Sequence, residues 1–300
     1  MSSSVSQTVP LPILEYSAAL EKIQAIQTAE VAQEGFDPRL QTILLTHGQK
    51  THRAVLWFHG YTAAAAQFRQ LGEICYQRGY NVLVPCVPHH GFKNRMSPET
   101  SRVKAQELLQ FTPAMVDLMH GLGDEVVVGG LSMGGALASW VAQNRGDVRT
   151  AVIVSPFLGA KIIPTNLTRV VAFGMQFLPD NKRWWGPELK EASAGPDYGY
   201  VQNSTHSLGQ ILKLGFQVAD AARSRRPLVA DIWMAVNDND QAVNNEMAER
   251  LVASWQKAGA KSVRNFHFPA SLGLPHDLIS IEQPGANPQV VYDELMKMVG

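Results

Sequence analysis

Short apolar runs and stretches with helical spacing alternate along most of this chain. The apolar runs predict strands at residues 41–46, 54–59, 81–85, 126–129, 151–154, 228–236 and 262–268. Apolar residues three to four positions apart predict helices near 13–26, 64–77, 98–122, 167–177, 208–222, 245–257 and 288–299. Strands that alternate with helices in this way require a mostly parallel sheet covered by helices on both faces. The sequence therefore predicts an α/β fold.

The alternation is interrupted in the middle of the chain. Residues 157–226 are rich in proline, tryptophan and tyrosine, and helical spacing recurs there in two stretches. We interpret this segment as a cap inserted above the carboxyl edge of the sheet. Residues 39–156 and 227–300 then form one core domain, and residues 1–38 form an N-terminal helical arm. Within the core, Pro113 either kinks its predicted helix or starts a new one.

Composition narrows the classes of partner. The chain carries 26 Lys and Arg and 26 Asp and Glu residues, so its formal net charge is zero. This balance gives no electrostatic case for nucleic acid or an anionic membrane, and no apolar run approaches the roughly 20 residues that span a bilayer. Cys75 and Cys86 are too few for a disulfide framework, and residues 1–12 lack the pattern of a secretory signal. We therefore expect a cytoplasmic protein with reduced thiols.

The candidate chemistry centres on Gly130-Leu131-Ser132-Met133-Gly134, which directly follows a β-branched run. A serine with glycine two residues to either side, between a strand and a helix, has the pattern of a nucleophile elbow. Such a turn forces its apex into strained dihedral angles, and glycine avoids collisions with the neighbouring backbone. The alternative is a glycine-rich turn that happens to hold a serine, so residues elsewhere in the chain must decide.

A nucleophilic serine needs a base to take its proton. In an elbow fold the acid and then the histidine follow the serine along the chain. Of the three later histidines, His206 falls in the inserted segment and is expected on its polar surface. His267 falls within a strand, which predicts a side chain bonded within the sheet. His276 lies in a loop beyond the last strand, so we predict it as the base.

The candidate acid follows the predicted strand at 228–236. Asp238 and Asp240 both lie in this loop, where a carboxylate at the carboxyl edge of the sheet can meet the far nitrogen of the imidazole. We favour Asp240, and Asp238 is the alternative that caps or braces the turn. Asp277 directly follows His276, and adjacent side chains rarely point at one another. We therefore expect Asp277 to anchor the loop.

Two backbone amides are candidates for an oxyanion hole. The helix after the serine offers the unpaired N–H of Met133. The second candidate is the N–H of Tyr61, on the loop after the second predicted strand. Gly60, just before it, lets the backbone come close to a substrate. The Tyr61 side chain either lines the pocket or packs. His59 is expected to shape this loop through a structural hydrogen bond rather than to act as a base.

The remaining candidates concern metal and substrate binding. His89 and His90 lie on a loop with no carboxylate or cysteine at ligand spacing nearby, which argues against a metal site and favours a loop role near the pocket. Aromatic residues of the predicted cap form either an acyl pocket or a small core of the insertion. The candidate pocket residues are His59, His90, Phe173, Phe177 and Trp184.

These motifs occur together, in this order, in one known superfamily. The segments Phe58-His59-Gly60-Tyr61-Thr62 and Pro88-His89-His90-Gly91, the elbow at 130–135, Asp240 with Val243, and His276 resemble the α/β-hydrolase superfamily. Within it, the chain is most similar to bacterial carboxylesterases and monoacylglycerol-lipase-like enzymes, from about residue 40 to the end. One departure is visible. Relatives commonly carry arginine or aspartate and then glycine before the His-Gly of the second segment, where this chain has Pro88-His89.

The resemblance implies an α/β-hydrolase fold with an inserted cap and no cofactor. It implies Ser132 as nucleophile, His276 as base and Asp240 as acid, with the amides of Tyr61 and Met133 as oxyanion hole. The expected activity is hydrolysis of small, uncharged, short- to medium-chain acyl esters through an acyl-enzyme. Amide hydrolysis, acyl transfer and perhydrolysis share this intermediate and remain alternatives, as does a non-catalytic ligand-binding member of the fold. No oligomeric state follows from the sequence.

Overall fold

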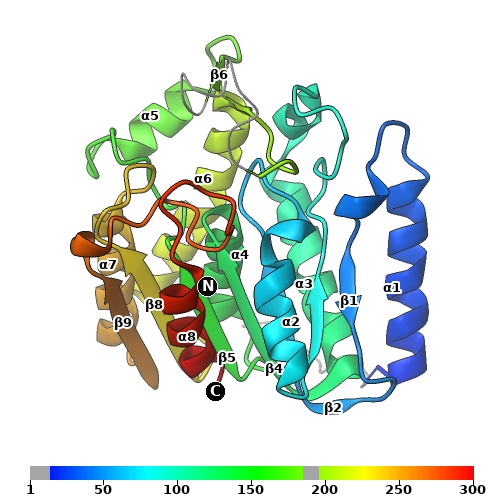
Figure 1. Ribbon diagram of the computed structural model, residues 1–300. Coiled ribbons are helices and arrows are strands. Elements are labelled where there is room, and N and C mark those ends of the chain that lie inside the picture. The colour runs from blue at the N-terminus through cyan, green and yellow to red at the C-terminus, as the bar shows by residue number, and fades with distance from the viewer. Residues whose placement is uncertain (1–13, 185–195) are drawn as a thin grey trace, which may run out of the picture.

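The protein is organised around one central β-sheet. The computed structural model describes residues 14–184 and 196–300 (Figure 1). The strands of the sheet are β1 (Ile43–Leu45), β2 (Thr51–Phe58), β3 (Asn81–Val84), β4 (Gly123–Leu131), β5 (Thr150–Val154), β8 (Asp231–Asn237) and β9 (Ser262–Phe268). Their order is β1-β3-β2-β4-β5-β8-β9, and every neighbouring pair is parallel except β1 with β3. The predicted mostly parallel sheet is confirmed.

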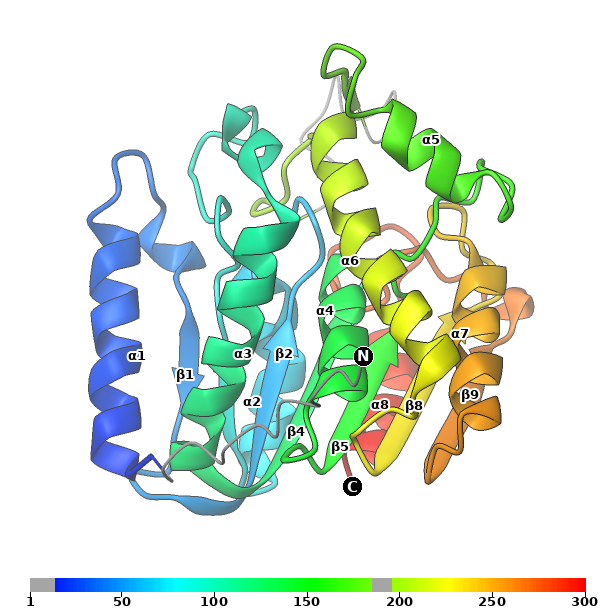
Figure 2. The ribbon, with the colours of Figure 1, turned by 180° about the vertical axis from the view of Figure 1, so that it is seen from behind.

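Helices cover both faces of this sheet (Figures 1 and 2). The longer ones are α1 (Tyr16–Val31), α2 (Arg69–Gln77), α3 (Ala105–Leu122), α4 (Met133–Asn144), α6 (Thr205–Ser224), α7 (Asn245–Lys257) and α8 (Pro288–Val299). One face packs against α3, α4, α6 and α7, with α1 beside α3 next to β1 (Figure 2), and the other packs against α2 and α8. Short 3-10 turns are η1 (Pro38–Leu40), η2 (Ala65–Phe68), η3 (Pro98–Arg102) and η5 (Ala270–Leu272). The architecture is therefore three-layered.

The centre of the sheet sets the position of the candidate site. All five residues of β5 are buried, as expected for a parallel strand that is covered on both faces. Because β4, β5, β8 and β9 are parallel, their carboxyl ends meet at one edge of the sheet, at the top in Figure 1. The loops after these strands carry Ser132, Asp240 and His276.

The inserted segment lies beyond this edge. It contains α5 (Thr168–Gly174) and the short strands β6 (Lys182–Trp184) and β7 (Gln202–Ser204), which pair with each other in antiparallel orientation. Helix α6 begins in this segment and then packs against α4 in the core layer (Figure 2). Because α6 belongs to both parts, the boundaries of the cap at 157–226 stay a prediction.

Helix α3 settles the alternatives for Pro113. The helix continues through this proline without a break, so the prediction of a fresh start is wrong. A proline removes one backbone donor from the helix. Buried residues on both sides, including Leu108 and Met119, keep α3 packed on the sheet despite that loss. Among residues 14–184 and 196–300, no helix combines the length and the apolar character needed to cross a membrane.

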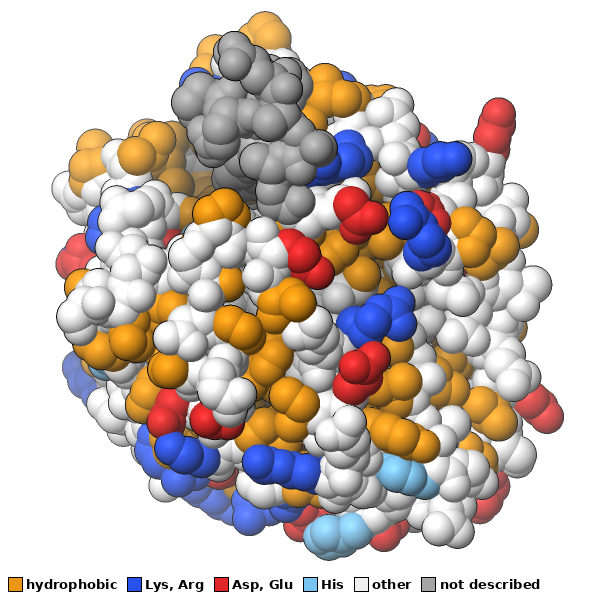
Figure 3. Space-filling model, in the orientation of Figure 1, with side chains coloured by type: hydrophobic (Ala, Val, Ile, Leu, Met, Phe, Trp, Pro, Cys, Tyr) orange, Lys and Arg blue, Asp and Glu red, His pale blue; other side chains and the backbone are white. Residues whose placement is uncertain are grey.

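Helix α5 turns apolar side chains toward the surface. Thr168 and Ala172 are buried on its inner side, whereas Val170 is 68% exposed. Other exposed apolar residues in and around α5 are Ile162, Leu167, Phe173, Phe177 and Leu178. Figure 3 shows apolar surface over this helix, at the upper left. Helix α5 therefore exposes more apolar surface than is usual for a helix whose only role is to pack on a core.

Candidate active site

Ser132 lies at the tip of the turn between β4 and α4. Its φ angle is 58°, in the left-handed region that non-glycine residues rarely adopt. The Ser132 N–H donates to the Val154 carbonyl at 3.0 Å, and its carbonyl accepts from Phe157 N at 2.9 Å. These bonds to the end of β5 and to the segment after it hold the strained turn in place.

The glycines of the elbow are required by contact. A Cβ at Gly134 would lie 1.9 Å from the Phe58 carbonyl oxygen, and one at Gly130 would lie 2.5 Å from the backbone of Gly134. Helix α4 therefore starts directly against the end of β2. This contact is the physical reason for the spacing of glycines around Ser132.

The Gly134→Ala variant is expected to lower the free energy of unfolding by about 3 kcal/mol or more, because α4 must move away from β2 to admit the methyl group. Urea denaturation measures this change. The matched control is Gly174→Ala at the end of α5, where nothing lies within 4 Å of the new Cβ. That control should stay within about 1 kcal/mol of the parent. Equal stability of Gly134→Ala and the parent would contradict the steric account.

Asp240 and His276 form a hydrogen-bonded pair beyond the ends of β8 and β9. The His276 Nδ1–H donates to Asp240 Oδ2 at 2.7 Å. The other carboxylate oxygen accepts from the amides of Ala242 at 2.8 Å and Val243 at 3.0 Å. Asp240 is fully buried, and the His276 side chain is 26% exposed. Because Nδ1 donates to the carboxylate, Nε2 is the nitrogen that can accept a proton.

The pair shifts the titration of both groups. Burial alone would raise the pKa of Asp240, but the charge and hydrogen bond of His276, together with the amides of Val243 and Ala242, outweigh burial and hold the pKa below its usual value. Burial alone would lower the pKa of His276, but the charge and hydrogen bond of Asp240, with the charge of Asp277, outweigh burial and raise the pKa above the usual value. The arrangement therefore suits an ionised acid beside a base that titrates above its ordinary range.

The other candidate acids and bases lie elsewhere. His267 Nδ1 bonds to Asp238 at 2.8 Å, and both side chains are 40% exposed. His206 is half-buried, and its Nε2 bonds to the Leu178 carbonyl at 2.7 Å, within the inserted segment. The Asp277 carboxylate accepts from the amides of Ile279 and Ser280, so the prediction that it anchors its loop is confirmed. The pairing of Asp238 with His267 was missed, although both lie at the ends of adjacent parallel strands.

The loop after β2 lies directly beside Ser132. A Cβ built on Gly60 would be 3.7 Å from the Ser132 Cβ. The next residue, Tyr61, has a buried side chain whose hydroxyl donates to the Thr100 carbonyl at 3.1 Å and accepts from Ser204 N at 3.2 Å. The Tyr61 side chain, which was expected either to line the pocket or to pack, therefore packs. Met133 is the first residue of α4, where helical N–H groups have no intrahelical partner.

The candidate pocket residues do not form one group. His59 is fully buried, His90 is 2% exposed, and their ring centroids lie 5.0 Å apart. Phe173 and Phe177 are 66% and 74% exposed, with ring centroids 4.9 Å apart. The Trp184 side chain lies outside the described residues. Their assignment to a substrate pocket stays a prediction.

His89 bonds to two glutamates rather than to the adjacent His90. Its Nε2 lies 2.8 Å from Glu107 Oε2, and its Nδ1 lies 3.6 Å from Glu99 Oε2. Across the described ranges 14–184 and 196–300, no group of three or more His, Cys, Asp and Glu side chains is placed to hold a metal ion. The structure thus offers no candidate metal centre within those ranges.

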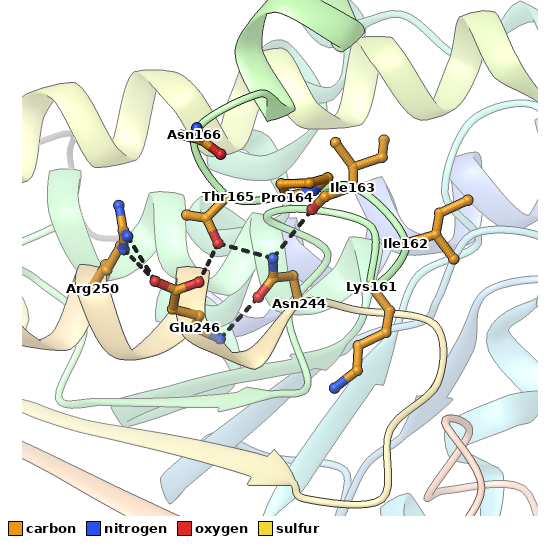
Figure 4. A pocket seen from close by; sticks show the side chains of 9 residues that line it. All are labelled: Lys161, Ile162, Ile163, Pro164, Thr165, Asn166, Asn244, Glu246 and Arg250. Carbon is orange, nitrogen blue, oxygen red and sulfur yellow. Dashed lines mark hydrogen bonds and ion pairs between the residues drawn. The ribbon is translucent and has the colours of Figure 1, made fainter.

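Residues 160–165, which we call the stem of the inserted segment, are bonded to the loop that carries Asp240. Ala160 and Val243 form a β-bridge, and Lys161 N donates to the Ala242 carbonyl at 3.0 Å. Asn244 Nδ2 donates to Thr165 Oγ1 at 3.1 Å (Figure 4). A pocket of about 400 Å³ lies between this stem and the start of α7. None of the three candidate catalytic residues lines it.

A model of the alpha/beta hydrolase family matches residues 43–286, which include the elbow, the Asp240 loop and His276. The chain belongs to the α/β-hydrolase family. This hydrolase is 24% identical, over 234 residues, to a thermostable monoacylglycerol lipase from Bacillus sp. (strain H-257). That match covers 75% of this chain and 86% of the lipase.

Solved structures show the same fold. One, from work on the metagenome-derived lipolytic enzymes LipS and LipT, superposes with a TM-score of 0.63 at 18% identity and covers 88% of the hydrolase and 98% of that chain. The monoacylglycerol lipase of Paleococcus ferrophilus gives a TM-score of 0.62 at 15% identity, and the match covers 86% of the hydrolase and 98% of that lipase. Est1E from Butyrivibrio proteoclasticus, with ferulic acid bound, gives 0.58 at 13% identity, covering 86% and 95%. At these identities the likeness shows the fold alone.

Proposed function

We propose that the hydrolase is a serine esterase that cleaves uncharged carboxylic esters through an acyl-enzyme. The observation that carries this proposal is the buried Asp240–His276 pair, which lies at the same edge of the sheet as the strained Ser132. The proposed roles are nucleophile for Ser132, base for His276 and acid for Asp240. The amides of Tyr61 and Met133 are the proposed oxyanion donors.

The reaction takes place in two steps. His276 Nε2 takes the hydroxyl proton of Ser132 while the oxygen attacks the ester carbonyl, and two amides stabilise the negative charge on the carbonyl oxygen. The histidine then gives the proton to the leaving alcohol, and the acyl group stays on the serine. A water molecule, deprotonated by the same base, releases the carboxylic acid and restores the serine hydroxyl.

The pH dependence follows from the base. His276 accepts a proton only when it is neutral, so kcat/KM is expected to rise with pH, with a midpoint above the ordinary histidine value of 6.5 because Asp240 raises its pKa. Initial rates on a neutral ester give this profile. His267→Asn, which alters the exposed pair, should leave the midpoint unchanged. A flat profile from about pH 5 to 9 would argue against His276 as base.

The substrate class is proposed to be neutral acyl esters of short to medium chain length. The zero net charge of the chain gives no basis for selecting a charged substrate. A monoacylglycerol is included because the Bacillus relative is named as a monoacylglycerol lipase.

The decisive experiment is a panel of p-nitrophenyl esters of increasing acyl length, run beside a monoacylglycerol and a p-nitroanilide. Hydrolysis of short and medium esters, with slower cleavage of the anilide, is the expected result. Absence of turnover on every ester, or preference for the anilide, would overturn the proposal.

A further inference from the structure

Two buried histidines connect the loop beside Ser132 to the loop that follows β3. We call residues 59–62 the oxyanion loop and residues 87–92 the second loop. His59 lies on the oxyanion loop, and its Nε2 accepts from Val87 N on the second loop at 2.9 Å. His90 lies on the second loop, and its Nε2 accepts from Thr62 N on the oxyanion loop at 3.3 Å. Each loop therefore supplies the histidine that binds a backbone amide of the other.

The hydrogen bonds fix the protonation of both rings. His59 Nδ1 donates to the Gly60 carbonyl at 2.9 Å, and His90 Nδ1 donates to the Pro88 carbonyl at 3.0 Å. Since Nε2 accepts from an amide in both cases, each ring must be neutral with its proton on Nδ1. Burial favours this state, because it lowers the pKa of His59 to about 3 and that of His90 to about 4.

We infer that His59 and His90 form a reciprocal clasp whose function is to position the Tyr61 amide for the developing oxyanion. The inference rests on the proposed function. Tyr61 lies between the two bonded positions, because the His59 ring bonds to the carbonyl of Gly60 before it and the His90 ring accepts from Thr62 N after it. An oxyanion donor acts only when it is held in place before the reaction. In this inference both buried histidines are positioning residues, which act through the Tyr61 amide.

A tyrosine from the inserted segment joins the same two loops. Tyr200 N donates to the Thr62 carbonyl at 2.7 Å, and the Tyr200 hydroxyl accepts from Phe92 N at 2.7 Å. The His90 and Tyr200 rings meet edge to face, with centroids 6.0 Å apart. Thr62 is thus bound at its amide by the clasp and at its carbonyl by Tyr200. The backbone after Tyr61 is fixed from both directions.

A matched pair of variants tests the clasp. The amide oxygen of His90→Gln can take the place of Nε2 and accept from Thr62 N, whereas the shorter side chain of His90→Asn reaches only the place of Nδ1. Rates on a p-nitrophenyl ester are divided by the concentration of active sites titrated with a fluorophosphonate. We expect His90→Asn to lower kcat about 10- to 100-fold with KM within about twofold, because a displaced donor weakens transition-state binding alone. His90→Gln should stay within about threefold of the parent.

Several outcomes would overturn the clasp. Equal kcat per active site in His90→Asn and the parent is one, and a rise in KM without a fall in kcat is another. If His90→Asn does not fold, ¹⁵N spectra of the parent labelled at histidine decide, since the clasp requires Nδ1–H rings at both His59 and His90. An Nε2–H ring at either position contradicts it. A parent that the fluorophosphonate does not label at Ser132 would instead refute the proposed function.

Discussion

Replacing Ser132 with alanine is expected to lower kcat by about 100,000-fold or more, to the level of the uncatalysed reaction plus the contribution of binding and the oxyanion hole. No acyl-enzyme can form without the hydroxyl oxygen, because His276 then has no serine proton to take and no serine oxygen attacks the ester carbonyl. Steady-state rates on a p-nitrophenyl ester, with extensively purified protein, measure the loss. Mass spectrometry after fluorophosphonate treatment should show one adduct on Ser132 in the parent and none in the variant.

The matched control is Ser139→Ala on the same helix. The Ser139 hydroxyl is buried and donates to the Gly135 carbonyl at 2.8 Å, so it belongs to the packing of α4 and not to the turn. Its kcat should stay within about threefold of the parent. Ester hydrolysis retained by Ser132→Ala, or an adduct on another residue, would remove Ser132 from the mechanism.

The second large effect is expected at Asp240. Asp240→Asn should lower kcat by about 10,000-fold with little change in fold. The asparagine oxygen is needed by the amides of Ala242 and Val243, which donate to one carboxylate oxygen in the parent. Its amide nitrogen then faces His276, which must present an unprotonated Nδ1 and carry its proton on Nε2. The ring is left in the tautomer that cannot take the proton of Ser132.

Asp238→Asn is the discriminating control for this prediction. Asp238 bonds to the exposed His267 and not to His276, so its variant should keep kcat within about threefold of the parent. Measuring both variants at the pH of maximum rate compares two carboxylates of one loop. Loss of activity in Asp238→Asn with activity retained in Asp240→Asn would move the acid to the other position.

Much of the core could be predicted because local signals agree with packing. Helices α7 and α8 begin where the sequence places them, since Asn244 and Asn287 cap their first turns through side-chain oxygens. The centre of the sheet follows from short apolar runs such as β5, whose residues are all buried. The elbow could be predicted because Gly130 and Gly134 have no room for a side chain, and this requirement is visible in the sequence as the glycine spacing.

Other features depend on contacts between distant segments. Strands β6 and β7 pair with each other but have only three residues each, which are too few to show an alternation of apolar and polar positions. Strand β8 starts at Asp231, later than predicted, because Leu228 is 45% exposed and its amide bonds to the Ala142 carbonyl instead. A structural bond for His59 was expected, but its partner on a loop 28 residues away has no local signal.

The bridge between Ala160 and Val243 has a consequence for engineering this protein. Ala242 and Val243 donate their amides to one carboxylate oxygen of Asp240. The same two residues contact the start of the inserted segment at Lys161 and Ala160. A chimera that exchanges the inserted segment from residue 157 onward would therefore remove the bridge and the Lys161–Ala242 hydrogen bond, and with them part of the support of the Asp240 loop. Grafts should begin after Thr165, so that residues 157–165 keep their native contacts with residues 242–244.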